Sequence, residues 1–377
     1  MTRISDVRVD RLPMRFTEPL RLGERMSSWR ELALVQVDAD DGNTGVGELA
    51  LDAAGGRSKP AAFDILRDAL VGAVADDWQR LDEAMSSVLG QRRFDRAVRA
   101  AVDTAVLDLI GRSSGISVGV LIGATCRAVP VNAVLIASSD AQRRPAKIQD
   151  AARSLVQGGF RTLKIKREID GPDPVEIVQS VREAVGSDVR IRLDLNGDLA
   201  EKEAIRVLRG LTDLDLEYVE QPIDPSLGAA ALARVRRAVH VPIAADEAVE
   251  DPATAAELLA TGAVDVLVVK PMRVGGPRTA IRIARAAADS GVRTTISTFY
   301  ETGVGVAAAL HVAAAIPGDN AHGLATGALL ADDLIVDPLA VVDGLMTVPA
   351  GPGLGIELDS AAVERLRIPT GIGAVPG

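Results

Sequence analysis

Five short apolar runs between residues 162 and 271 decide the fold of this chain. They are TLKIK (162–166), VRIRLDLN (189–196), LEYVEQP (216–222), VPIAADEA (241–248) and VDVLVVKP (264–271). Their β-branched residues are typical of strands, and the alanine-rich segments between them have helical spacing. Strands that alternate with helices in this way form parallel β–α–β units.

The same alternation continues on both sides of these runs. VPVNAVLIA (129–137) precedes them, and RTTISTFYE (293–301) and HGLAT (322–326) follow them. Eight strands with seven helices between them predict an α/β fold, a (β/α)7β TIM-like barrel over residues 124–330. A barrel of about 250 residues with an added domain of about 100 fits the length of the chain.

The flanking segments have other patterns. Residues 3–14 and 31–50 alternate apolar and polar side chains around the turn DDGN, which predicts an antiparallel meander, and residues 61–112 have a helical period. We therefore expect an N-terminal α+β capping domain over residues 1–123, with a lid loop near 19–29. The tail, residues 331–377, is rich in Gly and Pro and is expected to return to the capping domain.

Composition excludes several classes of function. The net charge of −10 provides no concentrated basic face for nucleic acid. The single cysteine, Cys126, cannot form an intramolecular disulfide and suits a reducing compartment. The N-terminus lacks the apolar core of a signal peptide, and the longest apolar stretch, 304–316, is too short to span a bilayer. We expect a cytoplasmic protein with no nucleic-acid or membrane partner.

Charged residues recur at the ends of successive predicted strands, 24 to 31 residues apart. The carboxylates among them are Asp194, Glu220 and Asp246. Since the C-terminal ends of barrel strands form one ring, these three side chains are expected to converge. Three buried negative charges require a cation, and hard oxygen ligands select Mg²⁺, with Mn²⁺ as an alternative.

Lysines form the second half of the predicted site. Lys164 and Lys166 are two residues apart on one strand, so both point into the barrel. Paired ammonium groups lower each other's pKa, which makes a lysine a usable general base near neutral pH. Lys270 approaches the same space from a strand on the opposite side. A substrate carboxylate held between the lysines presents its α-carbon to a base on either face.

This ordered set of motifs resembles the enolase superfamily, and within it the muconate-lactonizing-enzyme subgroup. The resemblance extends over nearly the whole chain through GVGE, LKIK, DLN, VEQP, ADE, KPMRVGG and GPGLG. It implies that Asp194, Glu220 and Asp246 are the metal ligands. It further implies that Lys166 and Lys270 are the acid/base groups on the two faces. Lys164 would lower the pKa of Lys166 and contact the substrate carboxylate.

Other positions are weaker candidates under the same resemblance. Asn196 is similar to a group that lies close to the metal ligands. Arg25 and Met26, in the expected lid, are candidate specificity residues, and Glu301, at the seventh strand end, is a candidate for a hydrogen bond to substrate. Many relatives have serine at the position of Ala248. Relatives often assemble, so a homo-oligomer is expected.

The subgroup contains several reactions on small carboxylate substrates. The segment KPMRVGG resembles the o-succinylbenzoate synthase and N-acylamino acid racemase branch. We therefore expect synthase-type dehydration first, racemisation or epimerisation of an N-acylamino acid second, and muconate cycloisomerisation third. The eighth-strand region, LATGALL, lacks the paired carboxylates that hold the ammonium group of dipeptide substrates. A barrel that binds an acid without catalysis is the non-enzymatic alternative.

Overall fold

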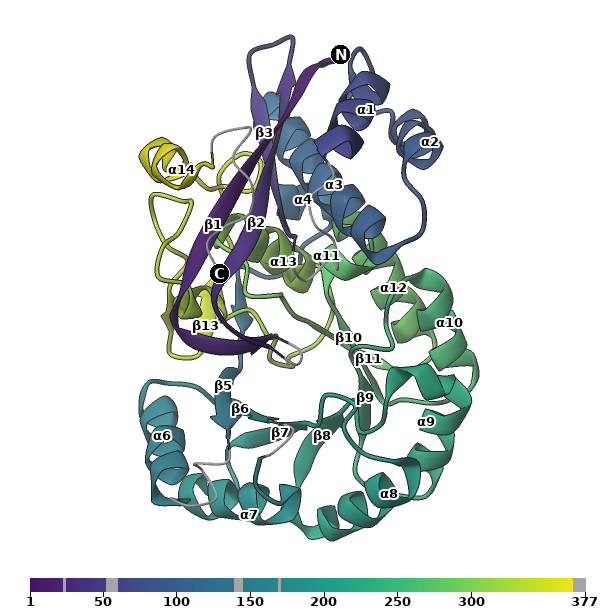
Figure 1. Cartoon of the computed structure of the whole chain (residues 1–377), viewed down its shortest axis with the longest axis vertical. Coiled ribbons are helices and arrows are strands. Elements are labelled where there is room, and N and C mark those ends of the chain that lie inside the picture. The colour runs from purple at the N-terminus through teal and green to yellow at the C-terminus, as the bar shows by residue number, and fades with distance from the viewer. Residues whose placement is uncertain (23–24, 52–59, 139–144, 169–170, 369–377) are drawn as a thin grey trace.

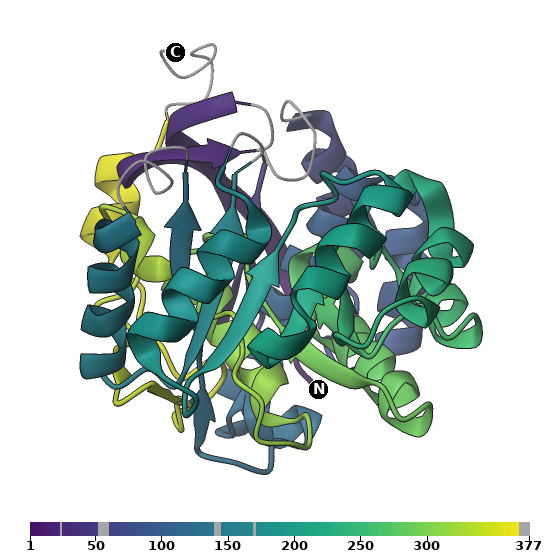
Figure 2. The ribbon, with the colours of Figure 1, turned by 90° about the horizontal axis from the view of Figure 1, so that it is seen from below.

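The structure is a computed structural model that describes residues 1–22, 25–51, 60–138, 145–168 and 171–368. An N-terminal sheet with its helices lies against a curved array of strands and helices (Figure 1). The β1–β2 hairpin of this N-terminal sheet lies across the end of the array toward which the strand arrows point (Figure 2).

The N-terminal unit begins with an antiparallel sheet in the order β1–β2–β3, as the meander pattern predicts. Its helices follow in sequence. The elements are β1 (Ile4–Leu22), β2 (Arg25–Ala39), β3 (Thr44–Ala50), α1 (Pro60–Leu70), α2 (Trp78–Val88), α3 (Arg93–Ser114) and α4 (Val118–Ile122).

Two glycines of the GVGE motif allow α3 to pack directly on β3. A Cβ atom at Gly45 would lie 2.0 Å from the carbonyl oxygen of Ala105, and one at Gly47 would lie 2.0 Å from that of Ala101. Such distances are far below van der Waals contact. The motif therefore brings helix and sheet backbones together and places the next residue, Glu48, at the boundary with the barrel.

Residues 19–29, expected as a lid loop, belong instead mostly to the paired strands of the β1–β2 hairpin. Leu20 pairs with Ser27, and Arg21 pairs with Met26. Residues 23–24, which join the strands, lie outside the described residues. Apolar and polar residues alternate through Leu20, Arg21 and Leu22 on the first arm, and this pattern extends the meander farther than a loop assignment allows.

The barrel contains a parallel sheet in the order β5 to β11, and each crossover carries at least one helix. The strands are β5 (Ala133–Ala137), β6 (Thr162–Arg167), β7 (Arg190–Asp194), β8 (Leu216–Glu220), β9 (Ile243–Ala245), β10 (Val266–Val269) and β11 (Arg293–Ile296). The helices are α6 (Pro145–Gln157), α7 (Pro174–Val185), α8 (Glu201–Gly210), α9 (Gly228–Arg237), α10 (Pro252–Ala260), α11 (Pro271–Val274), α12 (Pro277–Asp289) and α13 (Gly303–Ala314). Three short 3₁₀ helices are η1 (Thr212–Leu214), η2 (Pro225–Leu227) and η3 (Gly327–Leu329).

The eighth strand, expected at HGLAT, is reduced to two isolated parallel bridges. His322 bridges to Val131, next to β5, and Gly323 bridges to Ser297, next to β11. The Nδ1 atom of His322 also accepts a hydrogen bond of 2.9 Å from the backbone N–H of Ile296. The sheet thus closes into a barrel through two residues, because the chain leaves the ring after Gly323.

The C-terminal segment has two destinations. Strand β12 (Val341–Val342) pairs with β13 (Leu345–Thr347), and β13 pairs with β4 (Ala128–Pro130), which precedes the first barrel strand. Helix α14 (Ser360–Leu366) packs against β1, and the N–H of Ile368 donates to the carbonyl of Arg11. The segment therefore contacts both the start of the barrel and the N-terminal sheet.

Within the described part of the chain, no helix combines the length and the apolar composition needed to cross a membrane.

Gly47→Ala is expected to lower the free energy of unfolding by about 3 kcal/mol, because the added methyl group overlaps the α3 backbone. Urea denaturation measures the change. Gly158→Ala is the control, since its Cβ would make ordinary contacts of 3.4 Å or more, and its effect should stay below about 0.5 kcal/mol. Equal losses for the two variants would contradict the close packing of α3 on β3.

Candidate active site

The structure brings the predicted residues together at the C-terminal end of the barrel strands. In register, Lys166 on β6 pairs with Asp194 on β7, and Asp194 pairs with Glu220 on β8. Asp246 follows β9 directly, and Lys270 follows β10. All three carboxylate residues are at most 2% exposed. The ring expected from the spacing is therefore present.

Lys164 neutralises two of the carboxylates. Its Nζ atom donates to Oε1 of Glu220 at 2.7 Å and lies 2.9 Å from Oδ2 of Asp194. Burial alone would lower the pKa of Lys164, but these two carboxylates outweigh it and raise the pKa well above its usual value. Lys164 is therefore a fixed positive charge in this arrangement.

Asp246 is neutralised from the other side. It pairs with the ammonium of Lys270, and its Oδ1 accepts a hydrogen bond of 2.7 Å from the guanidinium of Arg273. Burial would raise the pKa of Asp246, but Arg273 and Lys270 together hold it below its usual range. For Lys270, burial and the charge of Arg273 lower the pKa of the ammonium despite the pairing with Asp246.

Arg273 contacts the carboxylate cluster, and the sequence analysis did not identify it. It is 4% exposed, and its Nη1 atom also donates to the backbone carbonyl of Asp246 at 2.5 Å. The motif KPMRVGG contains it, but a lone arginine three residues after a lysine gives no spacing signal. Its contact with Asp246 depends on how the short helix α11 turns back toward β9.

The carboxylate cluster retains two buried oxygen atoms that accept no hydrogen bond from any residue the structure describes. They are Oε2 of Glu220 and Oε2 of Glu247. Burial, followed by the negative charges of Asp194 and Asp246, raises the pKa of Glu220 to about 8. A buried carboxylate with an unsatisfied oxygen beside two others is a donor set that fits a hard divalent cation.

The side chains are nevertheless turned toward the cationic residues. Among the described residues, no group of three or more His, Cys, Asp or Glu side chains is arranged to hold a metal ion. Lys164 lies between Asp194 and Glu220, while Lys270 and Arg273 engage Asp246. Metal binding would therefore require these carboxylates to exchange some of their ion pairs for a shared cation.

Lys166 has different surroundings from its neighbour Lys164. Its Nζ atom lies 5.9 Å from the centre of the Tyr300 ring. Burial and Lys164 lower the pKa of Lys166, as the KxK spacing suggests, but Tyr300 and Asp194 raise it more. The net direction is therefore upward, opposite to the one expected from the sequence. Tyr300 was not identified, because its approach to Lys166 is a contact across the barrel.

Two polar residues orient the carboxylate cluster through hydrogen bonds that involve the backbone. The N–H of Asn196 donates to Oδ1 of Asp194 at 3.0 Å, while its side-chain amide donates to the carbonyl of Arg167. Oε1 of Gln221 accepts hydrogen bonds of 3.2 Å from the N–H groups of Asp246 and Ala248. Gln221 belongs to the VEQP motif, but its partners were not predicted.

Glu301 is buried at the boundary between the barrel and the N-terminal unit. Its Oε1 accepts a hydrogen bond of 2.9 Å from the N–H of Phe299. Glu48 lies nearby and accepts hydrogen bonds from the N–H groups of Thr302 (3.0 Å) and Gly305 (3.1 Å), at the start of α13. Burial, and then the charge of Glu48, raises the pKa of Glu301 to about 8.

The two hairpin candidates contribute little that the structure defines. Met26 is 57% exposed. The backbone of Arg25 pairs with Leu22, and its side chain lies outside the described residues. Contact between the hairpin and the site comes instead from Phe16, whose ring packs edge-on against Tyr300 at 5.9 Å between centroids.

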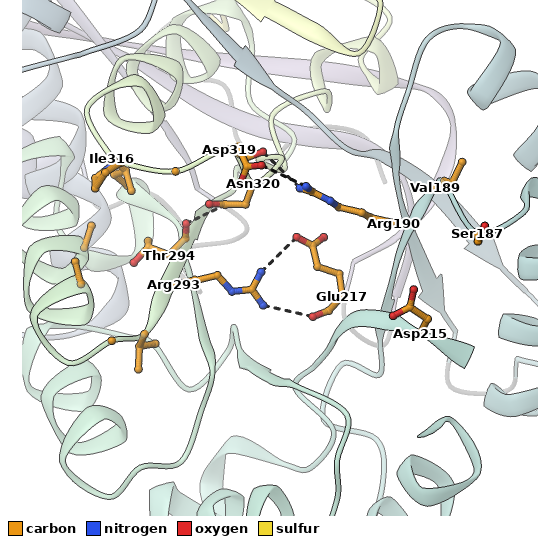
Figure 3. A pocket seen from close by; sticks show the side chains of 16 residues that line it. Ser187, Val189, Arg190, Asp215, Glu217, Arg293, Thr294, Ile316, Asp319 and Asn320 are labelled. Carbon is orange, nitrogen blue, oxygen red and sulfur yellow. Dashed lines mark hydrogen bonds and ion pairs between the residues drawn. The ribbon is translucent and has the colours of Figure 1, made fainter. Parts of the chain in front are cut away.

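A cavity of about 580 Å³ lies at the N-terminal end of the barrel strands, opposite the carboxylate cluster (Figure 3). It is lined by residues where β7, β8 and β11 begin, and its lining includes none of the predicted site residues. Arg190 and Arg293 in this cavity are paired with Asp319 and Glu217 at 3.4 and 3.5 Å. The cavity is therefore distinct from the ring of lysines and carboxylates.

Comparison with known proteins identifies the family of the chain. Residues 4–123 match the family model of the mandelate racemase / muconate lactonizing enzyme N-terminal domain, and residues 147–362 match the enolase C-terminal domain-like model. Muconate cycloisomerase 1-1 of Acinetobacter lwoffii is 31% identical over 352 residues, which cover 92% of each chain. The o-succinylbenzoate synthase of Thermobifida fusca is 39% identical over 227 residues, 58% of this chain and 66% of that protein.

Solved structures include the substrate-liganded L-Ala-D/L-Glu epimerase of Bacillus subtilis. It superposes with a TM-score of 0.84 at 26% identity and covers 94% of this chain and 98% of that one. Fold, site and family models together define a member of the enolase superfamily. Within it, the chain belongs to the muconate-lactonizing subgroup, and it is an enzyme of the lyase or isomerase type.

Glu301→Gln is expected to change how stability depends on pH. The carboxyl group keeps its proton up to about pH 8 when folded but loses it near its ordinary pKa of 4.5 when unfolded. The free energy of unfolding of the wild type should therefore fall as pH rises from about 5 to 8. A neutral amide removes this loss, so the variant should gain at least about 1 kcal/mol relative to wild type at pH 8 compared with pH 5.

Urea denaturation at pH 5 and pH 8 measures this difference. Glu257→Gln, on the exposed face of α10, is the control and should follow the wild type at both pH values. If the stability of Glu301→Gln relative to the wild type is the same at both pH values, the raised pKa of Glu301 is contradicted.

Proposed function

We propose that this enzyme removes the α-proton of a small carboxylate substrate. The observation that supports this proposal most directly is the placement of the two lysines. Lys166 and Lys270 approach one cluster of three buried carboxylates from different strands at the same end of the barrel. A lysine that becomes neutral is a suitable base, and the two lysines give access to both faces of the α-carbon.

Asp194, Glu220 and Asp246 would hold Mg²⁺, or Mn²⁺, in this proposal. A divalent cation at this position supplies the positive charge that a substrate carboxylate needs as its α-carbon loses a proton. The unpaired oxygen of Glu220 and the like charges around it support the assignment. Asn196 and Gln221 keep Asp194 and Asp246 oriented through backbone hydrogen bonds.

The chain's own residues divide the remaining work. Lys166 accepts the α-proton, and Lys164 provides a permanent positive charge beside it. Burial of the ring excludes water, which strengthens every charge interaction at the reacting carbon. Lys270 faces the site from β10 and either remains a cation or returns a proton on the opposite face.

We propose o-succinylbenzoate synthase-type dehydration as the specific reaction. The segment KPMRVGG and the 39% identity to the Thermobifida fusca synthase support it. In this reaction Lys166 takes the α-proton and delivers it to the β-hydroxyl group, which leaves from the same side as water, while Lys270 stays protonated.

Racemisation of an N-acylamino acid is the second candidate. It is favoured by Lys270, whose pKa is lowered by burial and by Arg273, because a second base must be able to lose its proton. Muconate cycloisomerisation ranks third, although the Acinetobacter lwoffii cycloisomerase aligns over 92% of the chain.

Lys166→Ala is expected to slow α-proton exchange about a thousandfold, because it removes the general base. The measurement is loss of the α-proton signal by NMR in D₂O with a panel of N-succinylamino acids. Lys202→Ala, on the exposed face of α8, should exchange at the wild-type rate. Exchange that survives in Lys166→Ala contradicts its assignment as the base, and exchange of no acid at all favours a barrel that only binds acids.

The synthase and racemase reactions are separated by their products. With the cyclohexadiene precursor, synthase activity produces an aromatic ring and a growing ultraviolet absorbance. Absence of this signal, together with interconversion of N-acylamino acid enantiomers by chiral chromatography, would select the racemase.

Glu220→Gln is expected to weaken Mg²⁺ binding at least about tenfold, because it removes one charged ligand. Isothermal titration calorimetry of the EDTA-treated protein measures the affinity directly, without a substrate. Glu257→Gln should bind Mg²⁺ as the wild type does. Unchanged affinity in Glu220→Gln would mean that the cation, if bound, lies elsewhere.

A further inference from the structure

Phe299 and Tyr300 follow β11 and place two aromatic rings in the active site. The chain contains only five Phe, two Tyr and two Trp among its 377 residues. Two adjacent aromatic residues at a barrel strand end are therefore unusual for this sequence. Neither ring was part of the predicted site.

Tyr300 contacts Lys166 and two residues of the N-terminal hairpin. Lys166 Nζ lies 5.9 Å from the Tyr300 ring centre, and the guanidinium of Arg30 lies 5.4 Å from it. Phe16 packs edge-on against the same ring, and Arg30 also donates to the Tyr300 carbonyl at 3.5 Å. The ring is thus held by β1 and β2 on one side and meets Lys166 on the other.

Phe299 occupies the matching position beside the other lysine. Lys270 Nζ lies 4.8 Å from its ring centre, and the guanidiniums of Arg273 and Arg93 lie 4.9 and 5.9 Å away. Ammonium groups at such distances are attracted by the ring quadrupole. The backbone N–H of Phe299 donates a hydrogen bond to Glu301, which orients this segment.

The backbone of this dipeptide is adapted to the arrangement. Tyr300 has a φ angle of 60°, a left-handed conformation that bulky residues seldom adopt. In a continuing strand, successive side chains would point to opposite faces of the sheet. The left-handed turn at Tyr300 breaks this alternation, so that both rings reach lysines of the same site. Strained backbone of this kind persists where the surrounding structure enforces it.

Lysine needs such support because its four-carbon side chain has many rotamers. Ordering a lysine side chain costs conformational entropy, and reaction rates depend steeply on the placement of the base. Lys164 is positioned by two carboxylates, but Lys166 has no ion pair among the described contacts. Its position depends on Tyr300, which interacts with it through the hydroxyl group as well as the ring.

We propose that Phe299 and Tyr300 are positioning residues, with Tyr300 placing Lys166 and Phe299 placing Lys270 for proton transfer. This inference rests on the proposed roles of the two lysines as acid/base groups. It adds that the N-terminal hairpin acts on Lys166 through Phe16, Arg30 and Tyr300.

The test uses the two enantiomers of an exchangeable N-succinylamino acid separately. Lys166→Ala and Lys270→Ala first identify which enantiomer each lysine deprotonates. Tyr300→Leu should then slow exchange of the Lys166 enantiomer about a hundredfold and leave the other near wild type, and Phe299→Leu should do the reverse. Tyr300→Phe keeps the ring but removes the hydroxyl group that interacts with Lys166, so it should slow this enantiomer less than Tyr300→Leu does. Phe160→Leu, before β6 at the far end of the barrel, should affect neither enantiomer.

Equal slowing of both enantiomers by each aromatic variant would overturn the proposal, since a general structural defect does not distinguish faces. Equal slowing by Tyr300→Phe and Tyr300→Leu would overturn the role of the ring. If wild type exchanges no acid, the proposed function has failed, and a second measurement decides the positioning roles.

That measurement is NMR of protein labelled at lysine. The chain has only six lysines, Lys59, Lys147, Lys164, Lys166, Lys202 and Lys270, so each signal can be assigned from a Lys→Arg variant. Ring currents should shift the ε-CH₂ protons of Lys166 and Lys270. Tyr300→Leu should move the Lys166 signal alone, and Phe299→Leu the Lys270 signal alone. Signals that remain in place, or that all move together, would contradict the proposed pairing.

Discussion

Repulsion between buried carboxylates is the constraint on which this structure depends. Asp194, Glu220 and Asp246 are almost fully buried within one ring, and such a group is unstable without compensating positive charge. Lys164 compensates two of them, and Lys270 with Arg273 compensates the third. Each compensating group comes from the end of a different barrel element, so the charge balance also ties neighbouring strands together.

The N-terminal unit packs against the barrel beside this charged cluster. The two glycines of its GVGE motif let β3 pack on α3. The next residue of the motif, Glu48, lies at the first turn of α13 and accepts hydrogen bonds from backbone N–H groups there. A carboxylate is well placed at a helix N-terminus because of the positive end of the helix dipole. The same unit supplies Phe16 and Arg30, which contact Tyr300. One small domain therefore both docks on the barrel and reaches its acid/base machinery.

The sequence predicts the repeated parts of this molecule well. Barrel strands recur with a regular spacing, and side chains at equivalent strand ends must share a ring, so Lys164, Lys166, Asp194, Glu220, Asp246 and Lys270 were placed correctly relative to one another. The eighth strand was wrong in extent, because HGLAT has the composition of a strand but pairs through only two residues. Arg273, Gln221, Phe299 and Tyr300 were missed because their roles arise from contacts between distant segments. The predicted direction of the pKa shift of Lys166 was wrong for the same reason, since the shift depends on Tyr300.

The closing residues His322 and Gly323 give the barrel a seam. Four backbone hydrogen bonds join these residues to the segments around β5 and β11, and the buried Arg192 reinforces them by binding Asn132 and the carbonyl of Ala321. Seven strands are thus joined by ladders of paired residues, while the barrel is closed by the isolated bridges of His322 and Gly323. The ring of lysines and carboxylates comes from the ends of other strands, β6 to β10, so the closure of the barrel and its chemistry depend on different residues.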